Sequence, residues 1–291
     1  MIARIEKLVI VGVGLIGGSF ALALKEAGAA GRVIGVGRGA GNIRRALDLK
    51  IIDVAGSLDK ATFDDADLVL LAVPVGQMQT VMRSIAPLVG EKTVVTDAGS
   101  TKQDVVRFAR RELKGTLSRF VPGHPIAGTE KSGAESALPG LYRGRRVVLT
   151  PLEGTDTDAL ALARAAWEAC GARVFELQPR EHDAVLATVS HLPHVLAYAL
   201  VDQVARQKNA KELFSYAAGG FRDFTRIAGS HPEMWRDICL ANRKALLAEL
   251  HRYEGELERV RRMLERGDAK ALDALFSGAR DARDRWLKDG E

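Results

Sequence analysis

The chain has 291 residues, of which 47% are hydrophobic, and it carries a formal net charge of +5. This length and apolar content are enough to bury a large core, and they indicate two domains. The positive charges are spread along the chain, which argues against a nucleic-acid-binding track and favours small anionic ligands. Cys170 and Cys239 lie far apart and lack metal-site or disulfide spacing, so we expect both to be core thiols.

The first predicted element is a short apolar strand, which is followed by the glycine-rich sequence GVGLIGG and a run of helix-forming residues. In a strand, loop and helix of this kind, Gly12 allows the tight turn, Gly14 leaves room for phosphates, and Gly17 lets helix and strand pack closely. Leu15 and Ile16 complete the loop and are expected to contact the same ligand. Free N–H groups at the helix start favour an anion, so this segment predicts a dinucleotide pyrophosphate site.

A signal peptide is the alternative for this segment, because residues 8–24 carry no charge, basic residues precede them, and residues 27–30 are small. Four glycines would spoil a targeting helix, and the uncharged stretch is short for a membrane span. We therefore expect a cytoplasmic protein that has no membrane partner.

The end of the second predicted strand, at residues 32–36, indicates which dinucleotide binds. An enzyme that uses NAD usually carries Asp or Glu there to bind the ribose 2′-hydroxyl, whereas this chain has Gly37 and Arg38. Arg38 can bind a 2′-phosphate, and Arg44 and Arg45 follow nearby. The sequence therefore favours NADP over NAD, with use of either cofactor as the alternative if Arg38 is only a solvated side chain.

Apolar strands separated by amphipathic helices then continue at residues 67–73, 93–97, 119–122, 146–150 and 173–177. This alternation predicts an α/β fold, a doubly wound Rossmann-type dinucleotide-binding domain that spans residues 1–178. Ligand-facing loops follow strand ends in such a sheet. Val73 and Pro74, and the turn at Gly99 and Ser100, occupy that position.

From residue 179 the pattern becomes helical, and we expect an all-helical dimerisation domain over residues 179–291. Ser230, Pro232 and Glu233 resemble a helix start. The predicted helices cover residues 181–207, 232–266 and 268–287.

An apolar stripe runs along the second of these helices and is longer than one small domain needs. We expect it to interlock two subunits into a homodimer, and the alternative is packing within its own domain. Trp235 is interpreted as a core aromatic in preference to a site wall. The stripe consists of Trp235, Ile238, Leu246, Leu250 and Leu257.

Polar residues and glycines are concentrated in four further segments, DAGSTK from residue 97, GHPIAGTEKSG from 123, SHLPH from 190 and GGFRDFTR from 219. With these motifs in this order, the chain resembles the prephenate and arogenate dehydrogenases of tyrosine biosynthesis, from about residue 7 to residue 243. The resemblance implies oxidative decarboxylation of prephenate to 4-hydroxyphenylpyruvate, with hydride transfer to NADP or NAD.

The resemblance also implies roles for single residues. His124 matches the histidine that receives the hydrogen bond of the substrate hydroxyl, a task suited to a neutral imidazole. Arg226 matches the arginine that grips a substrate carboxylate through a bidentate fork. Ser100 matches a serine beside the nicotinamide and the reacting hydroxyl, and His194 matches a side chain that contacts substrate.

Glu130 and Arg222 match a charged pair at the mouth of the family's site, although some relatives carry lysine in place of Arg222. A gating role for this pair is a hypothesis. His191 and His194 could suggest a metal pair, but no HExxH pattern or third ligand accompanies them, so no metal is expected.

Three alternatives remain open. Arogenate could replace prephenate, although no acidic residue stands out as a partner for the ammonium group of arogenate, which favours prephenate. A hydroxyacid dehydrogenase would explain the glycine loop and the helical part but not the motifs around His124 and Arg226. A cofactor-sensing protein without catalysis would be favoured only if these two positions were empty.

Overall fold

The computed structural model describes residues 4–129 and 131–289, so Glu130 lies outside the described residues. The chain divides into two compact units, residues 1–243 and residues 244–291. The predicted domain boundary between residues 178 and 179 stays a prediction.

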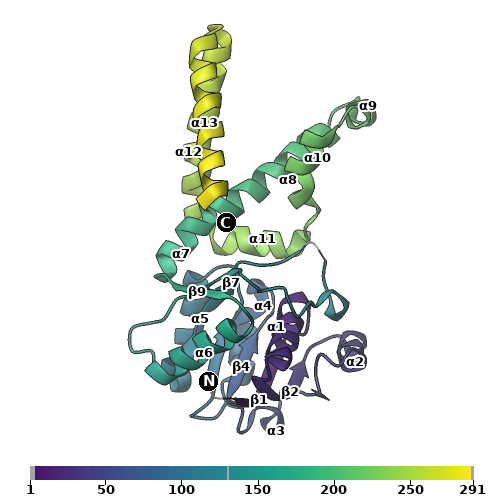
Figure 1. Cartoon of the computed structure of the whole chain (residues 1–291), viewed down its shortest axis with the longest axis vertical. Coiled ribbons are helices and arrows are strands. Elements are labelled where there is room, and N and C mark those ends of the chain that lie inside the picture. The colour runs from purple at the N-terminus through teal and green to yellow at the C-terminus, as the bar shows by residue number, and fades with distance from the viewer. Residues whose placement is uncertain (1–3, 130, 290–291) are drawn as a thin grey trace. The chain divides into compact units, whose positions relative to one another are not determined.

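The first unit is built on a six-stranded parallel sheet with strand order β3-β2-β1-β4-β5-β6 (Figure 1). From β1 the chain adds strands first on one side and then, from β4, on the other, so the direction of winding reverses between β1 and β4. This order is that of a Rossmann-type fold, and it confirms the predicted fold class. The strands are β1 (Ile5–Val11), β2 (Ala30–Val36), β3 (Val54–Ala55), β4 (Leu68–Leu71), β5 (Val94–Asp97) and β6 (Phe120–Val121).

Helices cover both faces of this sheet, and every residue of β4 and β5 is buried. Parallel strands buried on both faces form continuous apolar runs, which explains the sequence LVLL of β4. On one face Phe20 packs edge-on against Trp167, with ring centroids 4.5 Å apart. That face is covered by α1 (Leu15–Glu26), α2 (Ala40–Asp48) and α6 (Thr157–Ala169), and the other by α3 (Lys60–Phe63), α4 (Val75–Ile85) and α5 (Gln103–Glu112).

A second, three-stranded sheet consists of β7 (Gly123–Pro125), β8 (Arg146–Leu149) and β9 (Arg173–Glu176). The prediction that β8 and β9 join the main sheet is therefore wrong. After β6 the chain passes Pro122, which has no N–H for a further ladder bond, and pairs antiparallel with β8. This pairing sets His124 opposite Val148.

A helical segment follows in the same unit, and between its first two helices residues Ala187–His191 form a π-helical turn. Such turns often lie at functional sites, and here Pro193 directly follows in the next helix. The segment contains α7 (Pro179–Leu186), α8 (Leu192–Ala205), α9 (Ala210–Ser215), α10 (Gly219–Thr225), a 3-10 turn at Arg226–Gly229 and α11 (Pro232–Ala241).

The continuous run Pro179–Ala205 is 27 residues long with a mean hydropathy of 1.6, so length and composition alone would allow it to cross a membrane. Core helices pass the same test. This run carries His182, Asp183 and His191, which are all buried and bind other parts of the first unit. The run therefore contributes buried polar residues to the candidate site.

The helix predicted over residues 232–266 is interrupted. Its first part ends at Ala241, and Asn242 turns its side chain to His191 and to the backbone carbonyl of Asp183. These buried hydrogen bonds replace helical continuity. The start also differs by one residue, because His231 and not Ser230 is the N-cap before Pro232.

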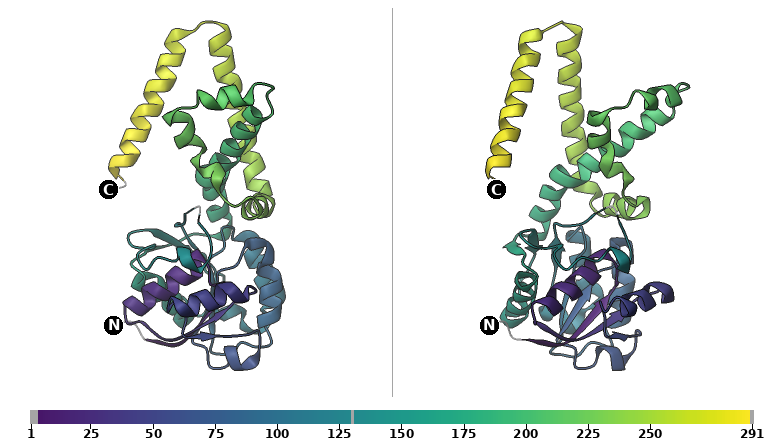
Figure 2. Two further views of the ribbon diagram at one scale, coloured as in Figure 1. Left: turned by 90° about the vertical axis from the view of Figure 1, so that its right-hand side faces the viewer. Right: turned by 45° about the vertical axis from the view of Figure 1, so that its right-hand side comes forward.

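The second unit is a pair of helices joined by a short turn, α12 (Arg243–Glu265, whose first residue belongs to the first unit) and α13 (Ala269–Asp289). Both views of Figure 2 show the two helices diverging from this turn. Large apolar side chains on them are exposed, at 53% for Leu257, 62% for Phe276 and 68% for Trp286.

Candidate active site

The glycine loop forms a cradle between β1 and α1. Gly12 has φ +100°, and a Cβ there would lie 2.3 Å from the carbonyl oxygen of Ala72. A Cβ on Gly17 would lie 2.2 Å from the Gly12 carbonyl oxygen. At Gly14, by contrast, a Cβ would meet nothing within 4 Å, and no side chain caps the helix that starts there at Leu15. These features fit a dinucleotide pyrophosphate, which needs close approach to uncapped N–H groups.

The other predicted cofactor residues follow the carboxyl ends of neighbouring strands. Ile16 lies in the first turn of α1, after β1, and its carbonyl accepts the Tyr142 hydroxyl at 2.6 Å. Val73 and Pro74 follow β4, and Pro74 is the N-cap of α4. Arg38 follows β2 and is exposed. Because β2, β1 and β4 are adjacent, the fold brings these residues to one edge of the sheet.

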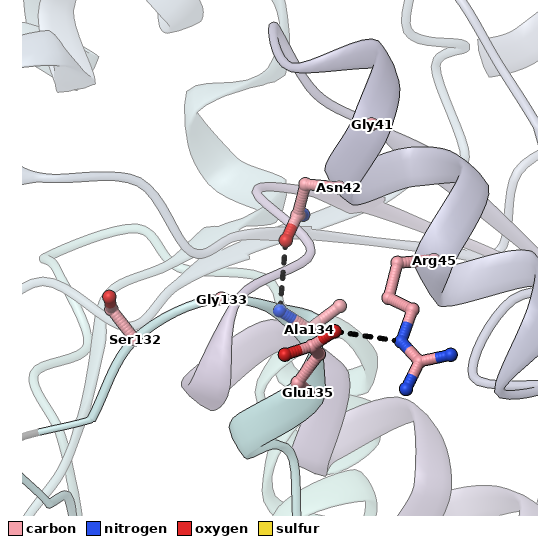
Figure 3. Close-up of a pocket in the computed structure, with 7 residues that line it drawn as sticks. All are labelled: Gly41, Asn42, Arg45, Ser132, Gly133, Ala134 and Glu135. Carbon is pink, nitrogen blue, oxygen red and sulfur yellow. Dashed lines mark hydrogen bonds and ion pairs between the residues drawn. The ribbon is translucent and has the colours of Figure 1, made fainter.

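An open cavity of ≈ 300 Å³ lies between the start of α2 and residues 132–135 (Figure 3). Asn42 connects its walls to the glycine loop, because it donates to the Val13 carbonyl at 2.6 Å and accepts from the Ala134 N–H at 2.9 Å. Arg45, which was predicted near the ribose, forms an ion pair with Glu135 at 2.9 Å. Arg38 does not take part in this ion pair with Glu135.

The buried carboxylate of Asp97, at the end of β5, anchors two loops. Its Oδ2 accepts the N–H of Gly99 at 2.7 Å, and its Oδ1 accepts the N–H of Gly123 at 3.1 Å. The residues that follow these glycines are Ser100 and His124, the two predicted catalytic residues. One carboxylate thus fixes the backbone beside both of them.

Lys102 completes this anchor from within the core. Its ammonium lies 2.5 Å from Asp97 Oδ2 and donates to the Gly123 carbonyl at 2.8 Å, and both charged side chains are fully buried. Burial raises the pKa of Asp97, while the charge of Lys102 and the hydrogen bonds oppose that rise. A buried pair of this kind holds geometry tightly, since neither charge can reach solvent.

His124 is nine-tenths buried and is the first member of a chain of three side chains. Its Nδ1 lies 2.8 Å from Nε2 of His182, and Nδ1 of His182 lies 2.9 Å from Oδ1 of Asp183. Burial, followed by the charges of His182, Lys102 and His191, lowers the pKa of His124 well below its usual value. His124 is therefore neutral at pH 7.

Sequence reasoning missed His182 and Asp183, although Asp183 binds two backbone N–H groups. Its carboxylate accepts the backbone N–H groups of Lys102 at 2.7 Å and Gln103 at 2.9 Å, where α5 begins. A signal was present, because an adjacent His-Asp pair lies near the start of the apolar helix predicted from residue 181, where polar side chains are unusual.

A second group of predicted residues lies in the helical segment. His194 donates from Nδ1 to the Ser190 carbonyl at 2.8 Å and stacks on Trp235, with centroids 3.5 Å apart. Burial lowers the pKa of His194, and the nearby positive charge of Arg226 adds to this. Trp235 is thus buried, as predicted, and also contacts a predicted site residue.

Arg226 and Arg222 are both exposed, on the 3-10 turn and on α10. His194, Trp235 and Arg226 lie together, because His194 stacks on Trp235 and is near enough to Arg226 for that charge to lower the His194 pKa. Glu130, the predicted partner of Arg222, lies outside the described residues.

The effect of burial on the pKa of His191 can be tested by measuring the free energy of unfolding at two pH values. Burial lowers the pKa of His191 to about 4, and its Nδ1 accepts from Asn242 at 3.1 Å, which requires the neutral form. In the unfolded chain His191 takes up a proton near pH 6.5, whereas in the folded chain it takes up the proton only near pH 4. Stability from this group is present above pH 6.5 and is lost between pH 6.5 and 4. Denaturant unfolding at pH 7.5 and pH 5 should show a loss of about 2 kcal/mol from this group.

The His191→Gln variant is the matched comparison, since its amide oxygen can accept from Asn242 but does not titrate. Its stability should fall less between the two pH values than that of the wild type. Equal slopes for the two proteins would contradict the assignment.

Comparisons with known proteins agree with this geometry. Residues 20–176 match the family model described as "Prephenate dehydrogenase, nucleotide-binding domain", and residues 178–278 match "Prephenate dehydrogenase, dimerization domain". The chain is 37% identical to a prephenate dehydrogenase of Bacillus subtilis, over 96% of this chain and 76% of the relative. It is 38% identical to a cyclohexadienyl dehydrogenase of Zymomonas mobilis, over 75% of each chain.

Two solved structures extend the comparison. A prephenate dehydrogenase from Aquifex aeolicus, in complex with hydroxyphenyl propionate and NAD+, has a TM-score of 0.89 and 38% identity, covering 97% of this chain and 98% of its own. An arogenate dehydrogenase from Synechocystis has a TM-score of 0.81 and 30% identity, covering 96% of this chain and 99% of its own.

Proposed function

The chain belongs to the prephenate dehydrogenase family, and from this membership and the site geometry we propose that it oxidatively decarboxylates prephenate to 4-hydroxyphenylpyruvate. It is an oxidoreductase that depends on a nicotinamide dinucleotide. The observation that carries the substrate assignment is the buried imidazole of His124, which contacts His182 and follows a glycine that Asp97 anchors at the edge of the sheet.

The reaction removes a hydride from C4 of the ring and carbon dioxide from C1. A bound nicotinamide supplies the acceptor for the hydride. His124 takes the proton of the 4-hydroxyl, so that a C4=O bond forms as the hydride leaves. The C1–carboxylate bond then breaks, its electron pair enters the ring, and the resulting phenolate oxygen takes the proton back. Prephenate and oxidised cofactor thus become 4-hydroxyphenylpyruvate, carbon dioxide and reduced cofactor.

Cationic and polar groups would hold the two carboxylates of prephenate while this occurs. Arg226 is suited to one carboxylate because a guanidinium binds it through two parallel hydrogen bonds. His194 lies beside Arg226 and contributes a side-chain contact. Ser100 would orient the 4-hydroxyl and the nicotinamide. Arg222 and Glu130 are proposed as a charged pair at the entrance, which for Glu130 rests on the sequence alone.

Arogenate is the second candidate substrate, because the relatives include enzymes named for each compound. Arogenate carries an ammonium group where prephenate carries a keto group, and none of the described residues proposed to contact the substrate (Ser100, His124, His194 and Arg226) is acidic. This set favours prephenate. Steady-state rates with each substrate and each cofactor test the assignment, and efficient turnover of a hydroxyacid with neither substrate accepted would overturn it.

NADP is the proposed preferred cofactor, with Arg38 as the residue that binds the 2′-phosphate. The Arg38→Gln variant should therefore raise the KM for NADP about tenfold and leave the KM for NAD unchanged, because only NADP carries the second phosphate. Initial rates with both cofactors measure this. Arg45→Gln is the matched control, since Arg45 is already paired with Glu135 and should show the smaller change. An equal change for both cofactors in Arg38→Gln would refute the assignment.

A homodimer in the cytoplasm is also part of the proposal. The match to a dimerization domain over residues 178–278 supports it, as do the exposed apolar side chains of α12 and α13. Sedimentation of the purified chain would show a single species of twice the monomer mass.

A further inference from the structure

The proton acceptor of the proposed reaction is connected to groups that the proposal above does not use. Beyond His124, the chain of side chains continues through His182 to Asp183. His182 is completely buried and Asp183 is 1% exposed, so neither exchanges protons directly with solvent. All three belong to the first compact unit.

The hydrogen-bond pattern fixes which nitrogen of each ring carries a proton. The Asp183 carboxylate only accepts, as its bonds from the N–H groups of Lys102 and Gln103 show, so Nδ1 of His182 is the donor. A neutral His182 then has a bare Nε2, which accepts from Nδ1–H of His124. His124 is left with a lone pair on Nε2, the form that a proton acceptor requires.

We propose that Asp183 and His182 are positioning residues that hold His124 in this tautomer and share the proton that it takes from the substrate. This inference rests on the proposed function. As Nε2 of His124 takes the hydroxyl proton, its Nδ1–H proton moves to Nε2 of His182. Positive charge then resides on His182, next to the Asp183 carboxylate. When the phenolate forms, Nε2–H of His124 returns a proton to the oxygen, and His182 returns its own to Nδ1.

The surrounding charges support transfer of charge toward Asp183. Burial lowers the pKa of His182, and the positive charge of Lys102 adds to this, whereas Asp183 and Asp97 favour the protonated ring. His124 is faced by His182, Lys102 and His191, all of which oppose a positive charge on it. Of the two rings, His182 alone has a carboxylate as hydrogen-bond partner, so it holds the transferred proton better.

Backbone contacts keep the chain of three side chains in place. Asp183 is fixed by the two N–H groups at the start of α5, and Asn242 donates to its carbonyl at 2.7 Å. At the other end, Lys102 and Asp97 hold Gly123 beside His124. The rings therefore meet without a rearrangement during the reaction.

Two substitutions at His182 separate positioning from proton sharing. In His182→Leu neither is possible, and we expect kcat for prephenate to fall about 100-fold. In His182→Gln the amide oxygen can accept from Nδ1–H of His124 but cannot take its proton. This variant should recover about tenfold over His182→Leu and stay about tenfold below the wild type. The KM for prephenate and the cofactor Kd should stay within about twofold.

A proton inventory distinguishes proton sharing from a purely structural role of His182, because a structural role would not change the number of protons that move. The single-turnover rate of reduced-cofactor formation is measured in mixtures of light and heavy water. Two protons move in the wild type, which predicts a curved dependence on deuterium fraction, whereas one proton moves in His182→Gln, which predicts a straight line. His251→Leu, at an exposed histidine on α12, is the control and should match the wild type.

The outcomes separate the two proposals. A wild type that turns over neither prephenate nor arogenate refutes the proposed function. An active wild type with a straight inventory, or a His182→Gln variant with wild-type rate, refutes proton sharing. A His182→Leu variant within about threefold of the wild type refutes positioning as well. If His182→Leu fails to bind cofactor, the inventory of His182→Gln decides.

Discussion

The His124→Asn variant is expected to lose about 10²- to 10⁴-fold in kcat for prephenate, with the cofactor Kd unchanged. Asparagine can still donate to Nε2 of His182 in place of Nδ1–H, so the buried contact at 2.8 Å has a substitute. It has no lone pair where Nε2 of His124 would meet the substrate hydroxyl. The loss should therefore appear in the chemical step, which single-turnover absorbance of the reduced nicotinamide measures.

Cofactor titration by fluorescence and a thermal melt show whether the variant is folded. A folded variant that binds cofactor and keeps wild-type turnover would remove His124 from the reaction. A variant with unchanged kcat and a strongly raised KM would instead make His124 a substrate-binding residue.

The Lys102→Met variant is expected to lower the free energy of unfolding by about 3–5 kcal/mol. Methionine has a similar length but no charge, so it leaves the Asp97 carboxylate fully buried without its cation. It also removes the donor that binds the Gly123 carbonyl at 2.8 Å. Urea denaturation monitored by circular dichroism measures the effect, and activity should fall too because His124 follows Gly123.

Arg206→Met is the comparison, since Arg206 forms an ion pair with Asp202 that is largely exposed. Exposed pairs contribute little to stability, so this variant should unfold close to the wild-type midpoint. A Lys102→Met protein as stable as Arg206→Met would show that Asp97 is neutral in the fold. It would also undermine the anchoring role given to this pair.

The parts of the fold that local pattern determines could be predicted from the sequence. The roles of two glycines in the loop follow from backbone geometry, because Gly12 has φ +100° and a Cβ on Gly17 would lie 2.2 Å from the Gly12 carbonyl oxygen. The parallel strands follow from continuous apolar runs such as that of β4. The second sheet could not be predicted, because strand length and composition do not say which sheet a strand joins.

Contacts between side chains that lie far apart in the sequence could not be predicted. His124 and His182 are 58 positions apart, and no periodicity connects them. The break at Asn242 was also hidden, since its flanking helices share one apolar pattern. Asn242 instead serves His191 and Asp183, two buried groups on another helix. Periodicity identifies the apolar face of a helix but does not say what the polar residues within that helix bind.

Asp183 has a consequence for modularity. The same carboxylate completes the histidine chain and receives the backbone N–H groups at the start of α5, which lies on the sheet. The helical segment that begins at Pro179 therefore cannot be exchanged independently of the sheet. A chimera joined between residues 178 and 179 would work only if the donor of the helices also supplied this histidine and carboxylate in register with the recipient's α5. Evolution of substrate preference by exchange of helices is limited in the same way.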